Sequence, residues 1–565
     1  MELKGAQILI KALLEEGVDT IFGYPGGVVL DIYDELHKGE IRHILVRHEQ
    51  GAAHAADGYA RASGKTGVCL VTSGPGATNT VTGIATAYMD SIPIVVMTGQ
   101  VPTALIGSDA FQEADITGIT RPITKHNFIV RRTADLARTV KEAFYIARCG
   151  RPGPVLVDLP KDVAQGTAVY EPSGTPQACL REPSYLPDTE ALQQVVEMLR
   201  QAKRPVVLTG GGIILGRASE ELRTFVRTTG IPITSTLMGL GAYPGTDPLW
   251  LGMPGMHGTY YANMAVSHAD LIIAVGVRFD DRVTGRLSDF ATQAKIVHID
   301  IDPVSINKNV LVDLPIVGDS RTALHQLNQM LEQEKNVLSA DDLGAWLGQI
   351  DRWREYAPLC YDSGDMIKPQ CVIETLYRLT GGEAVVATEV GQNQMWAAQF
   401  YHFNRPNQFL TSGGLGTMGY GFPAAIGAQV ACPDRTVLDI AGDGSIQMNI
   451  QELATVVNYN IPVKVVILNN GFLGMVRQWQ EIFYGRRYSH TNISQVPDFV
   501  KLAQAYGATG LRATRPEEME AVLKQGLETP GPVFMDMAVD PEEGVYPMVG
   551  PGASLTEMDL GRKKG

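Results

Sequence analysis

Two stretches of sequence, RTVLDIAGDG (435–444) and VKVVILNN (463–470), decide the fold. Each is a short apolar run rich in β-branched residues, and each ends in Gly, Asp or Asn. Such runs are typical of buried strands in a parallel sheet. The spacing between Asp443 and Asn470 leaves room for one helix and one crossover. Both side chains should therefore project from neighbouring strand ends toward one point.

Asp443 and Asn470 offer hard oxygen ligands, which suit Mg²⁺. That ion takes few protein ligands and completes its shell with phosphate oxygens and water. Gly442 and Gly444 let the backbone approach a ligand closely. A helix predicted to open at Ser445 would point its N-terminal amides at the same place. A lone Gly-Asp-Gly is more often a turn, but together with the Asn pair it predicts a site for a metal and a diphosphate.

The same alternation of strand and helix patterns runs through the chain, and it predicts three doubly wound α/β domains with parallel sheets. The expected domains are residues 1–165, 188–345 and 368–550, with a Pro-, Ser-, Gly- and Thr-rich linker over 166–187. The predicted strands lie in 41–48, 66–76, 92–99 and 153–160, then in 204–212, 269–276 and 294–303, and finally in 384–391 and the two stretches above. The first and third units could be distant duplicates, which one sequence leaves open.

Composition narrows the class of protein. The 565 residues carry 47 Lys and Arg against 61 Asp and Glu, a net charge of −14, without a basic run. This argues against nucleic acid or an anionic membrane as a partner. No apolar run reaches the roughly 18 to 20 residues of a membrane span, and residues 1–17 favour an amphipathic helix over a signal peptide. The six cysteines lack CxxC spacing, so we expect free thiols in a reducing, cytoplasmic compartment.

The Gly-Asp-Gly and Asn-Asn pair resembles the signature of thiamine diphosphate enzymes. The resemblance implies thiamine diphosphate and Mg²⁺ as cofactors, with the main-chain carbonyl of Phe472 as the third metal ligand. It also places a carboxyl group beside the cofactor's pyrimidine, at Glu49 within RHEQG (47–51). From the sequence alone, Glu49 would more often be a first-turn helix residue near the dipole.

A second matching segment is GGLGTMGYGFPAAIGA (413–428). The resemblance implies that the Gly416 carbonyl meets the cofactor's amino group and that Met418 supports its bend, although Met418 can also be ordinary core. Further contacts near the diphosphate are implied for Val390, Gly391 and Gln392. In this family Glu49 and Asp443 of one chain serve different cofactors, so at least a homodimer with active sites at the subunit interface is implied.

Over nearly its whole length the chain resembles the acetolactate synthase family. The stretches that carry the resemblance are GYPGG (23–27), RHEQGAAHAADGYAR (47–61), TSGPGATN (72–79), GSDAFQEAD (107–115), GMHGTYYAN (255–263), VGVRFDDRVTGR (275–286), HIDIDP (298–303), MVRQWQ (475–480) and VYPMVGPGAS (545–554). This implies decarboxylation of pyruvate and transfer of its two-carbon unit to a second 2-keto acid, pyruvate or 2-ketobutyrate, in branched-chain amino acid biosynthesis. A small regulatory subunit is also expected.

The segment RFDDR (278–282) implies FAD in the middle domain, because catabolic relatives without FAD lack it. The implied flavin contacts are Arg151, His257, Gly258, Thr259, Gly276, Arg278, Asp300, Asp302 and Asp319. Asp300 and Asp302 follow a strand, where carboxylates can meet ribose hydroxyls, but a plain strand-end turn remains open for them. Gly210-Gly211-Gly212 is a weak sign because it is not a GxGxxG pattern.

The resemblance further implies an acceptor pocket. Trp479 and Met475 would shape it, and Arg278 would pair with the acceptor carboxylate, as suits an arginine. Phe111, Gln112 and Lys161 would line the same cleft. The implied catalytic residues are thus Glu49, Gln112, Lys161, Arg278 and Trp479. Lys161 can equally be a surface residue, and Trp479 can be plain core.

The sequence leaves two rival functions open. A flavin-dependent pyruvate oxidase shares the cofactors, but RFDDR (278–282) and MVRQWQ (475–480) argue against it. A non-catalytic homologue that only binds cofactor or partners is disfavoured by the intact Glu49, Asp443 and Asn470.

Overall fold

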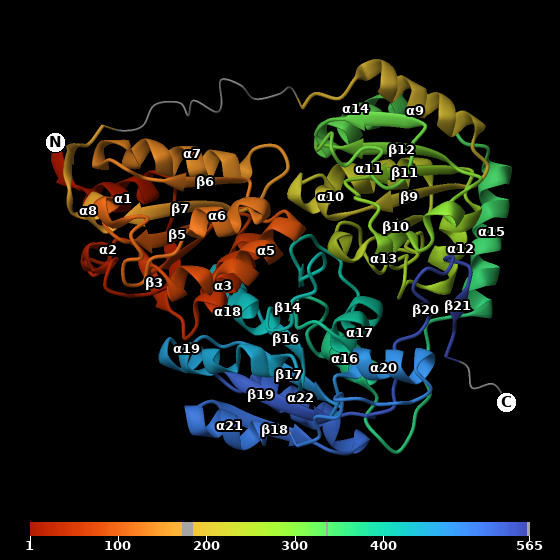
Figure 1. Cartoon of the computed structure of the whole chain (residues 1–565). Helices are drawn as coiled ribbons and strands as arrows, with labels where there is room; N and C mark the ends of the chain where they lie inside the picture. The colour runs from red at the N-terminus through yellow and green to blue at the C-terminus, as the bar shows by residue number, and fades with distance from the viewer. Residues whose placement is uncertain (172–184, 335–336, 496, 562–565) are drawn as a thin grey trace.

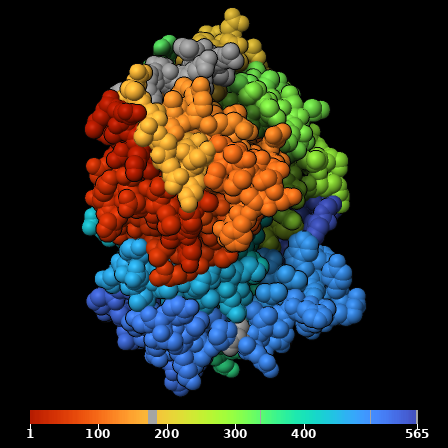
Figure 2. Space-filling model, turned by 60° about the vertical axis from the view of Figure 1, so that its left-hand side comes forward, coloured from red at the N-terminus to blue at the C-terminus, as the bar shows by residue number. Residues whose placement is uncertain are grey.

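The computed structural model describes residues 1–171, 185–334, 337–495 and 497–561. It contains three α/β domains with parallel sheets, arranged as three lobes around a common centre (Figure 1). In Figure 2 the red and orange N-terminal domain sits directly against the teal and blue C-terminal domain. The expected fold class is confirmed.

The N-terminal sheet has the strand order β3-β2-β4-β5-β7-β6, and all neighbours are parallel. Its strands are β2 (Thr20–Tyr24), β3 (Arg42–Leu45), β4 (Gly67–Val71), β5 (Ile94–Gln100), β6 (His126–Ile129) and β7 (Val155–Pro160). Its helices are α1 (Gly5–Glu15), α2 (Leu30–Leu36), α3 (Glu49–Ser63), α4 (Pro75–Thr78), α5 (Val81–Asp90), α6 (Ile116–Thr120), α7 (Leu136–Arg148) and α8 (Lys161–Gln165). Every residue of β4, β5 and β7 is buried, as their continuous apolar runs predict.

The C-terminal sheet repeats this topology, with the order β15-β14-β16-β17-β19-β18. Its strands are β14 (Val385–Thr388), β15 (Phe409–Leu410), β16 (Val437–Gly442), β17 (Lys464–Asn469), β18 (Thr509–Ala513) and β19 (Val533–Ala538). Its helices are α16 (Pro369–Leu379), α17 (Gln392–Phe400), α18 (Gly421–Ala431), α19 (Leu453–Asn458), α20 (Gly474–Phe483), α21 (Phe499–Tyr506) and α22 (Pro516–Glu528). The identical strand order supports the duplication that the sequence leaves open.

The middle sheet has the order β10-β9-β11-β12-β13 and is also parallel. Its strands are β9 (Pro205–Thr209), β10 (Ile233–Ser235), β11 (Leu271–Val275), β12 (Lys295–Asp300) and β13 (Leu314–Val317). Its helices are α9 (Thr189–Gln201), α10 (Gly211–Leu215), α11 (Ser219–Thr229), α12 (Tyr260–His268), α13 (Asp281–Thr284), α14 (Ser320–Glu332) and α15 (Ala340–Tyr356). The sequence patterns miss β10 and β13, which are short and lie at the two edges of the sheet.

The N-terminus and the start of the predicted linker depart from the sequence predictions. Residues 2–4 form strand β1 (Glu2–Lys4) rather than the start of a helix, and β1 pairs antiparallel with β8 (Thr167–Val169). The first residues of the predicted linker thus close the N-terminal domain, because backbone pairing satisfies their polar groups. The remainder of that linker, residues 172–184, lies outside the described residues.

The C-terminal segment returns to the middle domain. It forms a small hairpin of β20 (Met548–Val549) and β21 (Met558–Asp559). Val549 and Leu555 pack in one apolar cluster with Trp346 and Ile350 of α15. Figure 1 shows the hairpin lying against the lower end of this lobe, below α12.

In the described ranges, no helix combines the length and apolar composition that crossing a membrane requires. Five of the six cysteines fall in these ranges, and all five are free thiols, namely Cys69, Cys149, Cys360, Cys371 and Cys432.

Helices α3 and α18 join the N-terminal and C-terminal domains by direct backbone contact. A Cβ atom on Gly58 would lie 2.1 Å from the carbonyl oxygen of Ala424, and one on Gly427 would lie 1.9 Å from that of Ala55. Only glycine allows backbones to come this close. The crossing fixes how the helix that begins at Glu49 sits against the C-terminal domain.

We therefore predict that Gly427→Ala lowers the free energy of unfolding by at least about 2 kcal/mol, because the added methyl group overlaps backbone that cannot retreat. Thermal denaturation measures the effect. Gly344→Ala is the matched control, since a Cβ at this helix position meets nothing within 4 Å. The control should stabilise the chain by about 0.5 to 1 kcal/mol. Equal transition temperatures for Gly427→Ala and the unmodified chain would contradict the proposed close packing.

Candidate functional site

Asp443 and Asn470 meet at the carboxyl ends of β16 and β17, as their spacing predicts. The two strands are neighbours in parallel register, with Gly442 opposite Leu468. Asp443 Oδ2 accepts the N–H of Gly471 at 3.1 Å, and Asn470 Oδ1 accepts the N–H of Phe472 at 3.0 Å. The loop after β17 therefore closes onto the Asp443 carboxylate.

We call the place where Asp443 and Asn470 meet the metal corner. Its chemistry fits a divalent cation bound together with phosphate. Asp443 is only 1% exposed, and burial raises the pKa of its carboxyl to about 7. The described residues contain no group of three or more His, Cys, Asp and Glu that could hold a metal by themselves. A cation here would have one carboxylate and a few neutral oxygens, so it would need phosphate oxygens to complete its shell.

Residues 442–445 form the floor of this corner. The Ser445 hydroxyl lies 3.3 Å from both the N–H and the carbonyl of Gly442. A Cβ on Gly444 would lie 2.7 Å from Leu473 Cδ2 and 3.9 Å from Met418 Cε. Met418 is half-buried beside Gly444.

The helix predicted to open at Ser445 is wrong in detail. Two separate 3-10 turns, Ile446–Met448 and Ile450–Glu452, follow Ser445, and α19 begins only at Leu453. The break falls at Asn449, whose backbone leaves the helical region and whose side chain donates to the Gly419 carbonyl at 2.6 Å. This tertiary hydrogen bond competes with a continuous helix.

Val390, Gly391 and Gln392 follow β14, the strand next to β16 at the point where the strand order reverses. Ligands of doubly wound sheets gather at this point. Gln392 Oε1 accepts from Asn470 Nδ2 at 3.1 Å. A Cβ on Gly416 would lie 3.9 Å from Val390 Cγ1. The structure thus brings the predicted diphosphate residues together with the metal corner.

Glu49 is the first residue of α3, and His48 caps the helix by accepting the N–H of Gln50 at 3.1 Å. Glu49 Oε2 accepts from Asn79 Nδ2 at 2.9 Å, and a Cβ on Gly76 would lie 3.3 Å from Oε1. The carboxylate is half-buried. It faces the loop after β4 at the carboxyl edge of the N-terminal sheet and keeps an open side.

Gln112 lies against the same loop, while Phe111 and Lys161 stand apart. The Gln112 backbone has a φ of +59° and would lie 2.8 Å from a Cβ on Gly74. Phe111 is 87% exposed, and Lys161 is a half-buried residue at the start of α8. None of these three lines the central cavity of the described chain.

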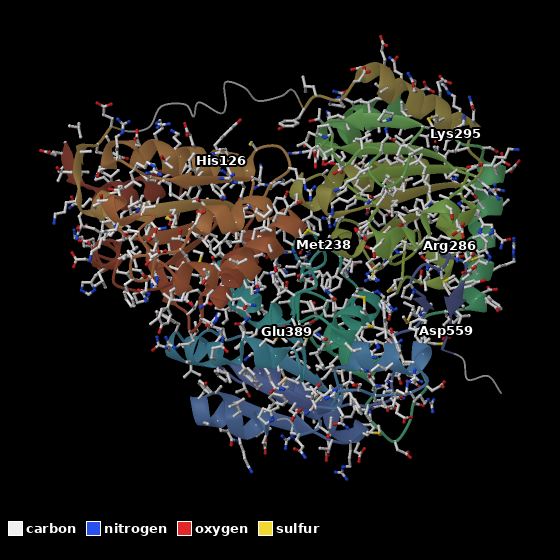
Figure 3. The ribbon with its side chains drawn as sticks, viewed as in Figure 1. His126, Met238, Arg286, Lys295, Glu389 and Asp559 are labelled. Atoms are coloured by element: carbon white, nitrogen blue, oxygen red, sulfur yellow. The ribbon has the colours of Figure 1, made fainter. Side chains whose placement is uncertain are left out.

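A cavity of about 670 Å³ opens where the three domains meet, a size typical of sites for large ligands. Figure 3 shows Met238, which lines it, near the middle of the molecule, while Lys295 and Asp559 lie toward its edge. The cavity gathers predicted residues from all three domains. They are Arg151, His257, Gly276, Arg278, Asp300, Asp319, Val390, Gly391, Gly416, Met475 and Trp479.

Two buried polar atoms of these lining residues fit a bound ligand. Trp479 Nε1 and His257 Nδ1 are buried without a hydrogen-bond partner among the described residues. Burial lowers the pKa of His257 to about 4, so its ring is neutral. Buried polar groups are normally paired. These two nitrogen atoms therefore indicate where a bound ligand would form hydrogen bonds with the cavity wall.

Of the flavin residues implied by the resemblance, most line the cavity, whereas Asp302, Gly258 and Thr259 do not in the described part of the chain. Arg151 pairs with Asp302 at 3.1 Å, beside the glycine-rich switch point of the middle sheet. Asp300 accepts the N–H of Asp302 at 2.8 Å, so the strand-end turn exists as well. Asp319 lines the cavity and also caps α14.

Gly258 and Thr259 do not line the cavity in the described structure. Thr259 caps α12 and donates to the Leu251 carbonyl at 2.6 Å. Gly258 packs tightly against the Met253 carbonyl. Both residues hold the segment that carries His257 in place.

Two buried glutamates that the sequence did not single out brace the site. Glu389 accepts the N–H groups of Gly419 and Phe422 at the start of α18, at 2.6 and 3.0 Å. Glu452 accepts the N–H groups of Arg47 and His48, at 2.9 and 3.1 Å, immediately before Glu49. Neither position shows a local pattern that points to a buried carboxylate, because Glu389 ends a strand pattern and Glu452 begins a helical one. Tertiary structure was therefore needed to find them.

The charge of Glu452 gives a pH prediction. Burial raises the pKa of this carboxyl to about 7. Its protonated form suits the folded state, so the stabilisation is complete below the unfolded pKa and is lost as pH rises through about 7. Glu452→Gln removes this titration. Relative to the unmodified chain, we expect Glu452→Gln to be more stable at pH 8 than at pH 5. The difference in the free energy of unfolding should be on the order of 2 kcal/mol.

Thermal denaturation at both pH values measures this difference, with Glu528→Gln as an exposed control. An offset for Glu452→Gln that is the same at pH 5 and pH 8 would show that the carboxyl does not titrate in this range.

Comparison with known proteins matches this geometry. Residues 3–119, 192–327 and 389–537 match the N-terminal TPP-binding, central and C-terminal TPP-binding domains of thiamine pyrophosphate enzymes. The chain is 51% identical over 569 residues to the acetolactate synthase isozyme 3 large subunit of Escherichia coli, covering 99% of both.

Two further relatives extend the comparison. The chain is 50% identical to the acetolactate synthase of Mycobacterium bovis, covering 99% of this chain and 92% of that protein. It is 49% identical to the chloroplastic acetolactate synthase 3 of Brassica napus, covering 98% and 86%. Identity at this level over the full length, on a matching three-domain fold, places the chain in the acetolactate synthase family of thiamine diphosphate enzymes.

Proposed function

We propose that this chain is a catalytic subunit that decarboxylates pyruvate and joins the two-carbon unit to a second 2-keto acid, pyruvate or 2-ketobutyrate. The product is 2-acetolactate or 2-aceto-2-hydroxybutyrate, precursors of branched-chain amino acids. The observation that carries the proposal is the cavity of about 670 Å³. It adjoins the metal corner through Val390, Gly391 and Gly416, and it holds both an arginine and an apolar wall.

Thiamine diphosphate supplies, when bound, a nucleophilic carbon and an acceptor for the electron pair released with CO₂. Asp443, Asn470 and the Phe472 carbonyl would hold Mg²⁺, and residues 442–445 with 390–392 would surround the diphosphate. The role of these residues is to bind and orient. The buried Asp443 carboxylate gains a cation that offsets its burial.

Glu49 would hold a proton at the pyrimidine nitrogen of the cofactor. Its hydrogen bond from Asn79 and the brace from Glu452 fix the carboxylate at the head of α3. We propose that it acts in the site of the partner subunit, so that the active unit is a homodimer or larger. Gln112, Lys161 and Phe111 lie on the same domain and would reach the partner's cleft with it.

Arg278 and Trp479 would select the acceptor. The guanidinium of Arg278 suits a planar carboxylate, and the indole of Trp479, packed edge-on against Phe483 at 5.7 Å, provides an apolar wall. Met475 lines the same cavity. One methylene distinguishes the two acceptors, which such a wall can resolve by about 1 to 3 kcal/mol.

FAD would occupy the arm of the cavity between Arg151, His257 and Asp319. The overall reaction involves no net redox change, so we assign FAD no step. A flavin-dependent pyruvate oxidase is not favoured, because the relatives described above are all named acetolactate synthases.

We further propose a smaller regulatory partner for this chain. Relatives named as large subunits support a smaller regulatory partner. We also retain the cytoplasmic location and the absence of a nucleic acid or membrane partner. The domain division 1–165, 188–345 and 368–550 is kept as a proposal, with the first domain extended by β8 to Val169 and the second by α15 to Tyr356.

The test is the product mix from pyruvate plus 2-ketobutyrate, with the protein loaded with thiamine diphosphate, Mg²⁺ and FAD under anaerobic conditions. We expect both acetohydroxy acids and an oxidised flavin. Acid converts 2-acetolactate to acetoin, which can be measured directly. Flavin bleaching at the rate of turnover would favour the oxidase, and a loaded protein without product would rule out catalysis.

We also predict that Glu49→Gln lowers kcat by about 10² or more, because the amide cannot hold the proton. Cofactor binding should be retained, since Asp443 and Asn470 are untouched. Steady-state activity and thiamine diphosphate titration measure the two properties separately. Unmodified activity in this variant would refute the role of Glu49.

A further inference from the structure

The C-terminal end of α5, residues 89–91, touches parts of the site from all three domains. Asp90 belongs to the N-terminal domain, and its side chain is fully buried. Asp90 Oδ1 accepts the N–H of Gly414 at 2.7 Å, and Oδ2 accepts the N–H of Gly413 at 3.1 Å. These glycines open the loop that carries Gly416 and Met418.

Of the two residues beside Asp90, Met89 contacts the middle domain directly, and Ser91 contacts it through Arg151, a residue of the N-terminal domain that pairs with Asp302. The Met89 carbonyl accepts from Arg278 at 2.6 Å, and the Ser91 hydroxyl accepts from Arg151 at 2.8 Å. Residues 89–91 therefore contact Arg278, which is proposed to bind the acceptor keto acid, Arg151, which is proposed to bind the flavin, and the cofactor loop. Asp90 and Ser91 also line the central cavity.

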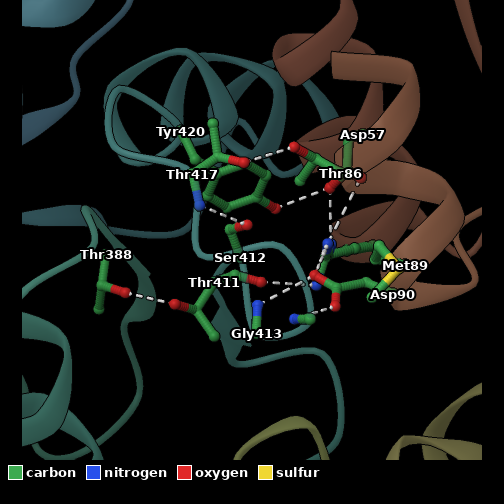
Figure 4. A network of polar contacts seen from close by, with 12 residues as sticks. Asp57, Thr86, Met89, Asp90, Thr388, Thr411, Ser412, Gly413, Thr417 and Tyr420 are labelled. Carbon is green, nitrogen blue, oxygen red and sulfur yellow. Dashed lines mark hydrogen bonds and ion pairs between the residues drawn. The ribbon is translucent and has the colours of Figure 1, made fainter. Parts of the chain in front are cut away.

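A buried network fixes Asp90 itself (Figure 4). Arg61 contacts Asp90 at 3.0 Å and Asp57 at 2.6 Å, and it donates to the Thr411 carbonyl at 2.9 Å. Tyr420 donates to Asp57 at 2.7 Å. One buried cation thus holds two carboxylates, and removing a member leaves the others unpaired, which is strongly destabilising in such networks.

We propose that Asp90 is a positioning residue that sets the distance between the cofactor loop at Gly413–Gly416 and the acceptor arginine, Arg278. The proposal rests on the function proposed above. Two strong hydrogen bonds from the N–H groups of Gly413 and Gly414 to the Asp90 carboxylate hold the loop on one side. The carbonyl of the preceding residue holds Arg278 on the other. Acceptor choice then depends on a residue that touches neither keto acid.

The physical consequence is a change in selectivity as well as in rate. In Asp90→Asn the side chain has one NH₂ group in place of a carboxylate oxygen. This group must face either a glycine N–H or the Arg61 guanidinium, so two hydrogen-bond donors are placed against each other. The loop and the Met89 carbonyl would shift relative to each other. A displacement near 1 Å can cost up to about 10²-fold in rate, and it changes the pocket that discriminates one methylene.

Gly414→Ala probes the same contact from the opposite side. The added Cβ would lie 2.9 Å from Met89 Cβ and 3.0 Å from Asp90 Oδ1. It therefore pushes on these two residues without removing a charge. Gly344→Ala, whose Cβ meets nothing within 4 Å, is the matched control far from the site.

The experiment measures the ratio of 2-aceto-2-hydroxybutyrate to 2-acetolactate in competition, together with kcat and KM for pyruvate. The ratio does not depend on the fraction of folded protein, so a purely structural role would leave it unchanged. We expect both Asp90→Asn and Gly414→Ala to change the ratio by roughly threefold or more, and the control to keep it.

A ratio and kcat/KM equal to those of the unmodified enzyme in Asp90→Asn or in Gly414→Ala would overturn the proposal. If Asp90→Asn does not fold, the Gly414→Ala ratio decides alone. Lower activity with an unchanged ratio would assign Asp90 a structural role only. An unmodified enzyme that makes neither product would instead refute the proposed function, which keeps the two failures distinct.

Discussion

The close crossing of α3 and α18 is the contact on which the arrangement of the two cofactor-binding domains depends. Backbone meets backbone at Gly58 and Gly427, without side chains between them. Helix α3 begins at Glu49, and α18 follows directly on the loop that contains Gly416 and Met418. A rigid crossing therefore fixes the proton-holding carboxylate relative to the C-terminal domain of its own chain. Glu452 reinforces this relation, because it accepts the N–H groups of Arg47 and His48 from the other domain.

Parallel topology explains why the functional residues collect at a few points. In each sheet the loops that follow neighbouring strands meet at one edge, and the strand order reverses there. In the C-terminal domain this point lies between β14 and β16, where Gly391 and Asp443 follow the strands. In the middle domain it lies between β9 and β11, where a Cβ on Gly212 would lie 2.5 Å from Gly276 Cα. The central cavity is formed where such edges of different domains face each other.

The sequence predicted ten strands of the three sheets as apolar runs, and with them the meeting of Asp443 and Asn470. It missed seven others, namely β2, β6, β10, β13, β15, β18 and β19. Five of these are edge strands of two to five residues, which are too short to show a clear pattern. The other two, β2 and β19, are buried inner strands that the pattern should have found. The helix at Ser445 was wrong because the Asn449 side chain bonds to Gly419, a contact between distant segments. Glu452 and Asp90 were beyond local patterns for the same reason. In the sequence each resembles an ordinary acidic residue on a helix. Its function depends on backbone N–H groups that another domain donates to it.

The central claim is that this chain activates bound thiamine diphosphate through a carboxylate at Glu49. The most direct measurement is the rate at which the C2 proton of the bound cofactor exchanges with deuterium, followed by proton NMR after acid quenching. The account predicts exchange far faster than in the free cofactor under the same conditions. A bound cofactor that exchanges at the rate of the free molecule would contradict it.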